Sequence, residues 1–356
     1  MACSPPSVWR GTVQLLARGP RLRTRCVRYS CVASATQDDA VRRTISLNGE
    51  LVVTVAVTTK LAAHTAQLHQ LAPTANAALN RALIASLLRV AGRTEGERVQ
   101  LSFKGNGPIG RVVALADHEY RCKGYVGDGS ADPPLRSDGK LNVGASNAMG
   151  FSPFCAHASH AHSVSLPTGA AVGPLGVLQV TRMHPVVPAY TGTVALASGE
   201  IADDVATFLA ESDQIASALG LGVSLDRSLS VRAAGGWLVQ ALPFASDETL
   251  ACLEANVRAL PPISDLVAKG CTPEAITDMI LGSIGASDGA VVNQPQYGPC
   301  VEADLRARME RATMALGKAE LERIVAQEGK LEATCEFCRM TLQLDADSVL
   351  RTIASD

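Results

Sequence analysis

The sequence predicts an α+β fold with a helical linker and a small C-terminal module. β-Branched runs alternate with glycine turns between residues 45 and 127, helical segments broken by proline and glycine fill residues 247–290, and a Cys-x-x-Cys pair follows a charged helix near the end. Of the 356 residues, 47% are hydrophobic and 19% charged, which is typical of a globular chain that buries a large core.

Charge and hydropathy exclude two classes of partner. The net charge of −2 gives no basic footprint for nucleic acid, and no apolar run is long enough to cross a bilayer. We therefore expect neither nucleic acid nor a membrane as a partner.

The first stretch differs from the rest of the chain. Residues 1–37 hold six arginines, no lysine and no acid, and Asp38 is the first acidic residue. Arginine-rich, acid-free character predicts an organelle transit peptide over residues 1–40. The alternative is an unstructured tail on a cytoplasmic protein.

Strands and helices then follow in order. Residues 45–58 are rich in β-branched side chains and predict a strand, and a helical stretch with His64 and His69 comes next. A second helix is expected from Pro73 to Gly92. Its leucines recur every four residues and predict a buried face: Leu79, Leu83 and Leu87.

A glycine motif lies within the next strands, which are predicted over residues 98–127. Gly105, Gly107 and Gly110 match G-x-G-x-x-G, but a dinucleotide site needs a helix after them, and strand-like residues follow instead. The motif is therefore interpreted as a glycine-rich hairpin turn.

A histidine-rich segment over about residues 151–172 interrupts this pattern. Its composition alone would suit a metal, with Cys155, His157, His160 and His162. Because it lacks apolar periodicity, we interpret it as a surface insertion.

Beyond the insertion, strands are expected at 174–182 and 191–199, and a helix over 198–219 with Ser198 as its N-cap. Residues 221–243 predict a strand pair in which Gly235–Gly236 marks a close backbone approach. A charged helix with a break at Gly317 and a short strand follow the linker.

The sequence shows no catalytic constellation, so we expect a protein that is not an enzyme. Nucleophile-elbow, zinc-protease and P-loop motifs are all missing. His118 and His184 stand singly, and Asp203, Asp204 and Glu211 are expected to be solvated on helix faces.

The ten cysteines do not form a disulfide framework. Cysteines such as Cys122 stand singly in apolar runs and are expected to act as small hydrophobic residues. Cys335 and Cys338, with Cys300 upstream, form the one local cluster. In a reducing compartment such a cluster indicates metal binding or redox sensing.

Several motifs, taken in order, resemble the redox-regulated 33 kDa chaperonin (heat shock protein) family. They are KGNGPIGR from Lys104, CKGYVG from Cys122, SGEIADD from Ser198, AAGGWLVQALP from Ala233, and CEFC from Cys335. The resemblance runs from about residue 40 to the C-terminus. The segment PPLRSDGKLNVG is similar to plastid and cyanobacterial-type members, which favours the plastid stroma over the mitochondrial matrix.

The resemblance implies an architecture and an activity. It implies an N-terminal chaperone domain of antiparallel sheets packed with helices over residues 41–246, a helical linker over 247–296, and a redox- or zinc-type module over 297–356. It also implies an ATP-independent holdase that binds unfolding client proteins under heat or oxidative stress and forms a homodimer when activated. In the family, a C-x-C and a C-x-x-C hold zinc until oxidation forms disulfides and releases the metal.

This chain departs from that pattern, which makes its redox switch degenerate. Counting back from Leu316–Gly317 places the C-x-C at Glu302 and Asp304, neither of which is cysteine. Three alternatives remain open: the two carboxylates replace thiolates as zinc ligands, Cys300 supplies a third sulfur, or Cys335 and Cys338 are left as a plain dithiol.

Two other functions compete with the holdase. A dithiol oxidoreductase would use Cys335 and Cys338, but redox C-x-x-C motifs begin a helix after a strand, and here a charged helix precedes the motif. A zinc ribbon for nucleic acid would need a second C-x-x-C and a basic face.

Overall fold

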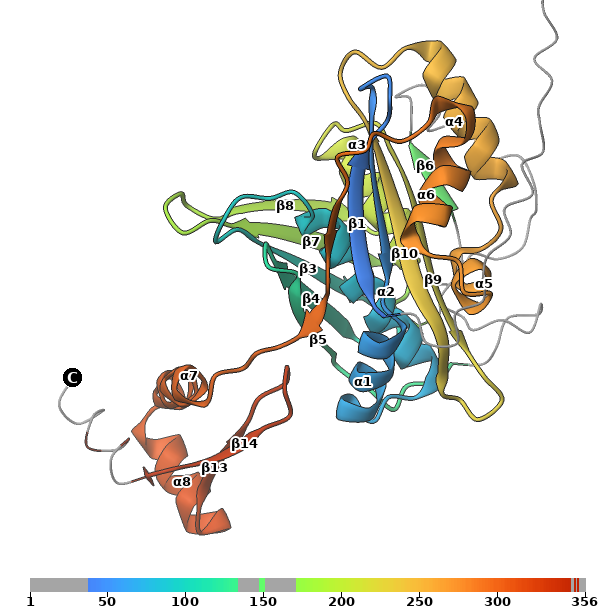
Figure 1. Ribbon diagram of the computed structural model, residues 1–356. Helices are drawn as coiled ribbons and strands as arrows, with labels where there is room; N and C mark the ends of the chain where they lie inside the picture. Colours follow the sequence, from blue (N-terminus) through green and yellow to red (C-terminus); the bar gives the residue numbers. More distant parts are fainter. Residues whose placement is uncertain (1–37, 134–146, 151–170, 347–348, 350, 352–356) are drawn as a thin grey trace, which may run out of the picture. The chain divides into compact units, whose positions relative to one another are not determined.

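The computed structural model describes residues 38–133, 147–150, 171–346, 349 and 351. Residues 1–37 of the transit peptide predicted over residues 1–40, and most of the histidine-rich segment, lie outside these residues. The described chain forms two six-stranded sheets and a two-stranded hairpin. Figure 1 shows them together with the helices. Within the described residues, no helix is long and apolar enough to cross a membrane.

The two large sheets are almost entirely antiparallel, as the resemblance implied. The first sheet has the order β11-β1-β2-β10-β9-β6, with bounds Val291–Asn293, Ala40–Ile45, Leu51–Val57, Val231–Ala241, Ser217–Leu225 and Asn147–Gly150. The second has the order β12-β5-β4-β3-β7-β8, with bounds Gln296–Tyr297, Arg121–Val126, Arg111–Asp117, Arg98–Gly105, Gly176–Met183 and Tyr190–Ala195. Among the strands that the structure describes, only β12 pairs in parallel, with β5.

Helices occupy both faces of the first sheet, and further helices form part of the C-terminal module. The first three are α1 (Thr59–His69), α2 (Pro73–Val90) and α3 (Ile201–Glu211). The linker holds α4 (Asp247–Ala259), α5 (Ile263–Ala268), α6 (Pro273–Leu281) and a 3-10 turn (Gly282–Ile284). The module holds α7 (Glu302–Met314), α8 (Lys318–Glu328) and the hairpin β13–β14 (Leu331–Thr334 and Thr341–Leu344).

The main core surrounds α2, which packs against strands of both large sheets. Leu79, Leu83 and Leu87 are fully buried, which confirms the predicted face. Two glycines allow the helix to approach closely. A Cβ at Gly236 would lie 2.6 Å from the Ile84 side chain, and one at Gly124 would lie 3.0 Å from Leu79. The expected close approach at Gly235–Gly236 is therefore confirmed.

The glycine motif forms the predicted hairpin turn, since β3 ends at Gly105 and β4 begins at Arg111. Gly110 has φ +71°, a left-handed conformation that glycine adopts without strain. The strand predicted over 45–58 is instead part of a hairpin, with β1 ending at Ile45 and β2 beginning at Leu51.

The helix expected over 198–219 is shorter than predicted. It ends at Glu211, and residues from Ser217 onward form β9, because pairing with β10 overrides the local helical pattern. Ser198 is not the N-cap. That position belongs to Glu200.

Asp204 was expected in solvent and is buried instead. Its carboxylate accepts hydrogen bonds from the backbone N–H groups of Ala197 (2.7 Å) and Ser198 (3.1 Å), which fixes the turn into α3. Burial raises the pKa of Asp204 to about 6, despite these two hydrogen bonds. Its role is therefore to hold the turn.

Candidate thiol site and the linker strap

The linker helices cover an apolar face of the first sheet. One side of β2 presents Leu51, Val53, Val55 and Val57, which form a single buried cluster with residues of β10 and of α4–α6. Because α5 packs closely, a Cβ at Gly222 would lie 2.7 Å from the Ile263 side chain. This face is called the covered face below.

From the helices, the chain runs across the edges of both sheets as an extended strap, defined here as residues 291–297. β11 pairs antiparallel with β1 through three residue pairs, and β12 pairs with β5 through two. Val291 and Val292 are 54% and 51% exposed, so few side-chain contacts add to this pairing. The β11 part of the strap is therefore attached mainly through a short backbone ladder.

Tyr297 ends the strap in a partly buried position. Its hydroxyl group lies 3.0 Å from the Gly124 carbonyl oxygen and 2.8 Å from Nε2 of His69. The same hydroxyl group is 2.5 Å from the carbonyl oxygen of Phe337, which stands between the two cysteines of the C-x-x-C pair. Tyr297 thus connects the strap, the N-terminal region and the cysteine turn.

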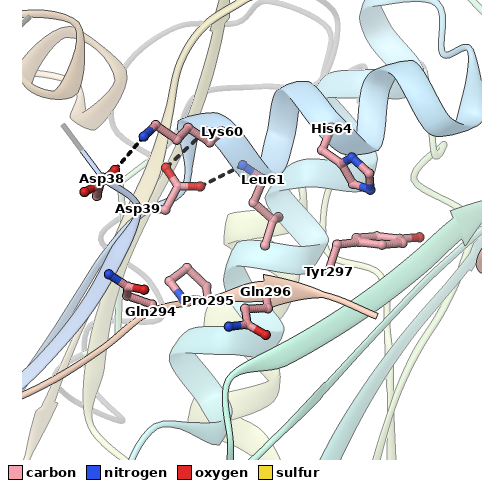
Figure 2. Close-up of a pocket in the computed structure, with 9 residues that line it drawn as sticks. All are labelled: Asp38, Asp39, Lys60, Leu61, His64, Gln294, Pro295, Gln296 and Tyr297. Atoms are coloured by element: carbon pink, nitrogen blue, oxygen red, sulfur yellow. Dashed lines mark hydrogen bonds and ion pairs between the residues drawn. The ribbon is translucent and has the colours of Figure 1, made fainter. Parts of the chain in front are cut away.

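Beside the strap lies a cleft of about 500 Å³. It is lined by two residues just before β1, by α1 and by the strap: Asp38, Asp39, Lys60, Leu61, His64, Gln294, Pro295, Gln296 and Tyr297. Figure 2 shows that its charged groups face one another. The Asp39 carboxylate accepts hydrogen bonds from the backbone N–H groups of Lys60 and Leu61 at the start of α1. The Asp38 carboxylate forms a salt bridge with the Lys60 ammonium group. These groups hold the start of α1 to β1, and we assign no chemistry to the cleft.

Three cysteines come together just beyond the strap. The sulfur atoms of Cys300, Cys335 and Cys338 all lie within 4.8 Å of one another. Cys335 is 6% exposed, and the other two are half-buried. Apolar side chains of α7, α8 and the β13–β14 hairpin form one side of the cluster: Leu305, Met309, Leu321, Leu331, Leu342 and Leu344. This arrangement is called the thiol cluster below.

The turn between β13 and β14 is shaped to present sulfur to a metal. The Arg339 N–H group bonds the Cys335 carbonyl oxygen at 2.8 Å, and Arg339 itself has φ +58°. Burial opposes ionisation of Cys335, yet N–H groups of Cys338 and Phe337 lower its pKa overall. Burial raises the pKa of Cys338 to about 11.

The two carboxylates that replace the expected thiols lie apart from this cluster. Glu302 and Asp304 are both exposed in the first turn of α7. The Glu302 carboxylate lies 3.6 Å from the Arg306 guanidinium group. Among the described residues, the group with metal-ligand spacing contains the three sulfurs and neither carboxylate. This geometry fits three of the four ligands that a structural zinc requires.

Comparison with known proteins decides the family. The Hsp33 protein family model matches residues 39–345, which is most of the chain. The chain belongs to the Hsp33 family. The 33 kDa chaperonin of Thermoanaerobacter sp. (strain X514) is 33% identical over 301 residues, covering 84% of this chain and 92% of that protein. That of Geobacter sulfurreducens is 34% identical over 300 residues, covering 84% and 90%.

A solved Hsp33 structure shows the same fold. The crystal structure of the 33 kDa chaperonin from Thermotoga maritima matches with a TM-score of 0.76 at 28% identity, covering 90% of this chain and all of that one. Family membership supports a chaperone function for this chain, as the sequence motifs implied.

Sequence reasoning missed the residues that join the thiol cluster to the rest of the protein. Tyr297 was not singled out, and Phe337 was passed over as a spacer between two cysteines. The Phe337 ring meets Tyr125 edge-on at 5.1 Å, and the Lys123 ammonium group lies 5.5 Å from its centre. A large aromatic residue inside a C-x-x-C turn was the available signal.

Proposed function

We propose that this protein is an ATP-independent holdase that binds unfolding proteins under heat or oxidative stress, with an altered thiol switch. The observation that carries the proposal is the covered face, an apolar sheet surface closed by α4–α6. A continuous apolar surface of this kind binds unfolded chains once it is uncovered.

The cover is built from elements that are easily displaced. α4, α5 and α6 have 13, 6 and 9 residues, lengths at which isolated helices are marginal in water. Their stability therefore depends on packing against the sheet and on the strap that follows them. Loosening of the strap would allow the helices to leave the covered face.

The thiol cluster lies at the far end of that strap. Bound zinc would cross-link the Cys300 segment to the β13–β14 turn and stabilise a module whose own core is small. When peroxide oxidises two of the thiols, an S–S bond forms, two electrons pass to the peroxide O–O bond, and both thiol protons leave in water. The module then loses sulfur ligands, and its hold on the strap weakens.

The switch is altered because it contains fewer thiols than the family pattern. Carboxylates at Glu302 and Asp304 cannot be oxidised to a second disulfide. The three cluster cysteines can form at most one disulfide among themselves. We therefore propose that heat contributes more to activation in this protein than in relatives with four cysteines.

The competing oxidoreductase function is less well supported. Cys335 and Cys338 lie in a turn between two strands, whereas catalytic C-x-x-C thiols are activated at a helix N-terminus.

We further propose that the protein is not an enzyme, that it forms homodimers when activated, and that it works in an organelle, with the plastid stroma favoured. Import of a fluorescent protein fused to residues 1–40 tests the last point.

Light scattering of a heated client protein tests the chaperone function. The full chain, reduced or treated with peroxide, is added at an equimolar amount without nucleotide. Suppressed scattering in at least one state is the expected result. Unchanged scattering in both states, or suppression only with ATP, contradicts the proposal. If the protein turns over a disulfide substrate but has no effect on client scattering, the oxidoreductase function is favoured instead.

A further inference from the structure

The thiol cluster presents three sulfurs without a fourth ligand among the described residues. The nearest sequence candidates, Glu302 and Asp304, are exposed, and Glu302 pairs with Arg306. A tetrahedral zinc site would have to complete its coordination from elsewhere. The cluster by itself suits an ion that is satisfied by three soft ligands.

The surroundings of the cluster add a second constraint. Leu305, Leu331 and Leu342 close one side, and Cys335 is nearly buried against them. Cys300 and Cys338 are half-buried, so the cluster remains accessible from one side. An ion with three ligands on one side and a non-bonding electron pair on the other matches such a half-open site.

We propose that the three thiols bind trivalent arsenic. Arsenous acid carries three hydroxyl groups on arsenic. Each thiol replaces one of them, so three As–S bonds form, three As–O bonds break, and the thiol protons leave in three water molecules. Arsenic stays trivalent, so no oxidant or reductant is needed. The lone pair on arsenic points to the side on which the cluster offers no ligand.

This inference does not depend on the proposed chaperone function. It concerns binding, and its test measures protein mass and absorbance rather than client protection. The test also distinguishes the contribution of Cys300 from that of the C-x-x-C pair. Phenylarsine oxide carries a single As=O group, and two thiols displace that oxygen as one water molecule. Cys335 and Cys338 suffice for this probe, whereas arsenite requires Cys300 as well.

The experiment compares the two arsenicals on the reduced full chain, freed of metal and kept in a phosphine reductant that does not compete as a thiol. The variants are Cys300→Ser, Cys338→Ser and, as a matched control, Cys252→Ser, whose single thiol is half-buried outside the cluster. Intact-protein mass counts bound arsenic, and arsenic–thiolate absorbance follows the titration.

We expect one tightly bound arsenic in the wild type and in Cys252→Ser. Cys300→Ser should weaken arsenite binding by more than about tenfold, since even changes around metal ligands cost that much. It should still bind phenylarsine oxide, which shows that Cys335 and Cys338 remain reduced and accessible. Cys338→Ser should weaken arsenite binding to a similar extent, because only two of the three sulfurs remain. Unchanged arsenite affinity in Cys300→Ser, or tight arsenite binding retained by Cys338→Ser, would overturn the proposal.

Discussion

The Tyr297 hydroxyl group donates toward the carbonyl oxygen of Phe337 at 2.5 Å, so the end of the strap is tied to the centre of the C-x-x-C turn. A phenol has one hydrogen, and the Gly124 carbonyl oxygen competes for it at 3.0 Å. Any change that moves Phe337 therefore alters how Tyr297 is held. This contact connects cysteine chemistry with the strap that precedes the thiol cluster.

Replacing Tyr297 with phenylalanine should loosen the strap without removing a cysteine. The ring is kept, but the partly buried hydroxyl group is removed and its hydrogen-bond partners are left unpaired. This should lower the free energy of unfolding by about 1–3 kcal/mol. Hydrogen exchange in residues 291–300 should accelerate, and reduced protein should suppress client aggregation more than wild type does. Tyr190→Phe, at an exposed position, is the control. Exchange rates equal to those of wild type would contradict the role given to Tyr297.

Acid should weaken the same contact through His69. Burial and the nearby charge of Arg339 lower the pKa of His69 from 6.5 to about 4, and His64 acts in the same direction. The folded protein therefore prefers the neutral ring. Its contribution to stability is complete above about pH 6.5 and is lost as the pH falls toward about 4.

Thermal unfolding measured between pH 7.5 and pH 4.5 checks this prediction. The melting temperature of His69→Gln should fall less steeply with acid than that of wild type, because the substituted side chain does not titrate. His184→Gln, in a loop outside this contact, should keep the wild-type slope. If His69→Gln and wild type show the same slope, His69 does not govern the acid response.

The fit between α5 and the sheet offers a way to open the covered face without touching the cysteines. A Cβ at Gly222 would lie 2.7 Å from the Ile263 side chain and 3.0 Å from the Ser264 backbone nitrogen. Gly222→Ala should therefore push α5 away, at a cost of about 1–3 kcal/mol. Reduced protein should then bind a hydrophobic dye and protect clients more strongly.

Gly289→Ala is the matched control for this change, because its added Cβ would meet nothing within 4 Å. It should leave both dye binding and client protection unchanged. Dye binding by Gly222→Ala at the wild-type level would show that α5 does not limit access to the covered face.

The parts of the fold that the sequence predicted are those with strong local signals. The leucines of α2 and the glycine turn between β3 and β4 each depend on a pattern within a few residues. The strap lacked such a signal. Val291–Asn293 is three residues long, and its pairing with β1 is a contact between distant parts of the chain. The strand propensity of three residues does not predict this pairing.

The thiol cluster is a second feature whose geometry the sequence alone did not predict. Counting back from Gly317 treated the segment before it as having the family's spacing, which placed ligands at Glu302 and Asp304. In the structure α7 begins at Glu302, so both positions lie in its first turn. Cys300 precedes the helix and belongs to no regular element, and its sulfur lies within 4.8 Å of the other two.

Zinc binding distinguishes the three ligand sets that the sequence left open. If Cys300 supplies the third sulfur, Cys300→Ser should reduce zinc affinity by more than about tenfold, since one of three thiolates is lost. Glu302→Gln/Asp304→Asn should leave affinity near the wild-type value, because both carboxylates lie outside the cluster. Competition with a chromophoric chelator, on reduced full-length protein, measures these affinities. A large loss in the carboxylate variant with none in Cys300→Ser would instead assign the oxygens as ligands, and zinc-free wild type would leave Cys335 and Cys338 as a plain dithiol.

Adding two sulfurs gives the converse test. Glu302→Cys/Asp304→Cys places new thiols at the start of α7, close in sequence to Cys300, and should bind zinc more tightly than wild type. Its chaperone activity should then depend more strongly on peroxide, because a firmly held metal keeps the module folded until oxidant removes its ligands.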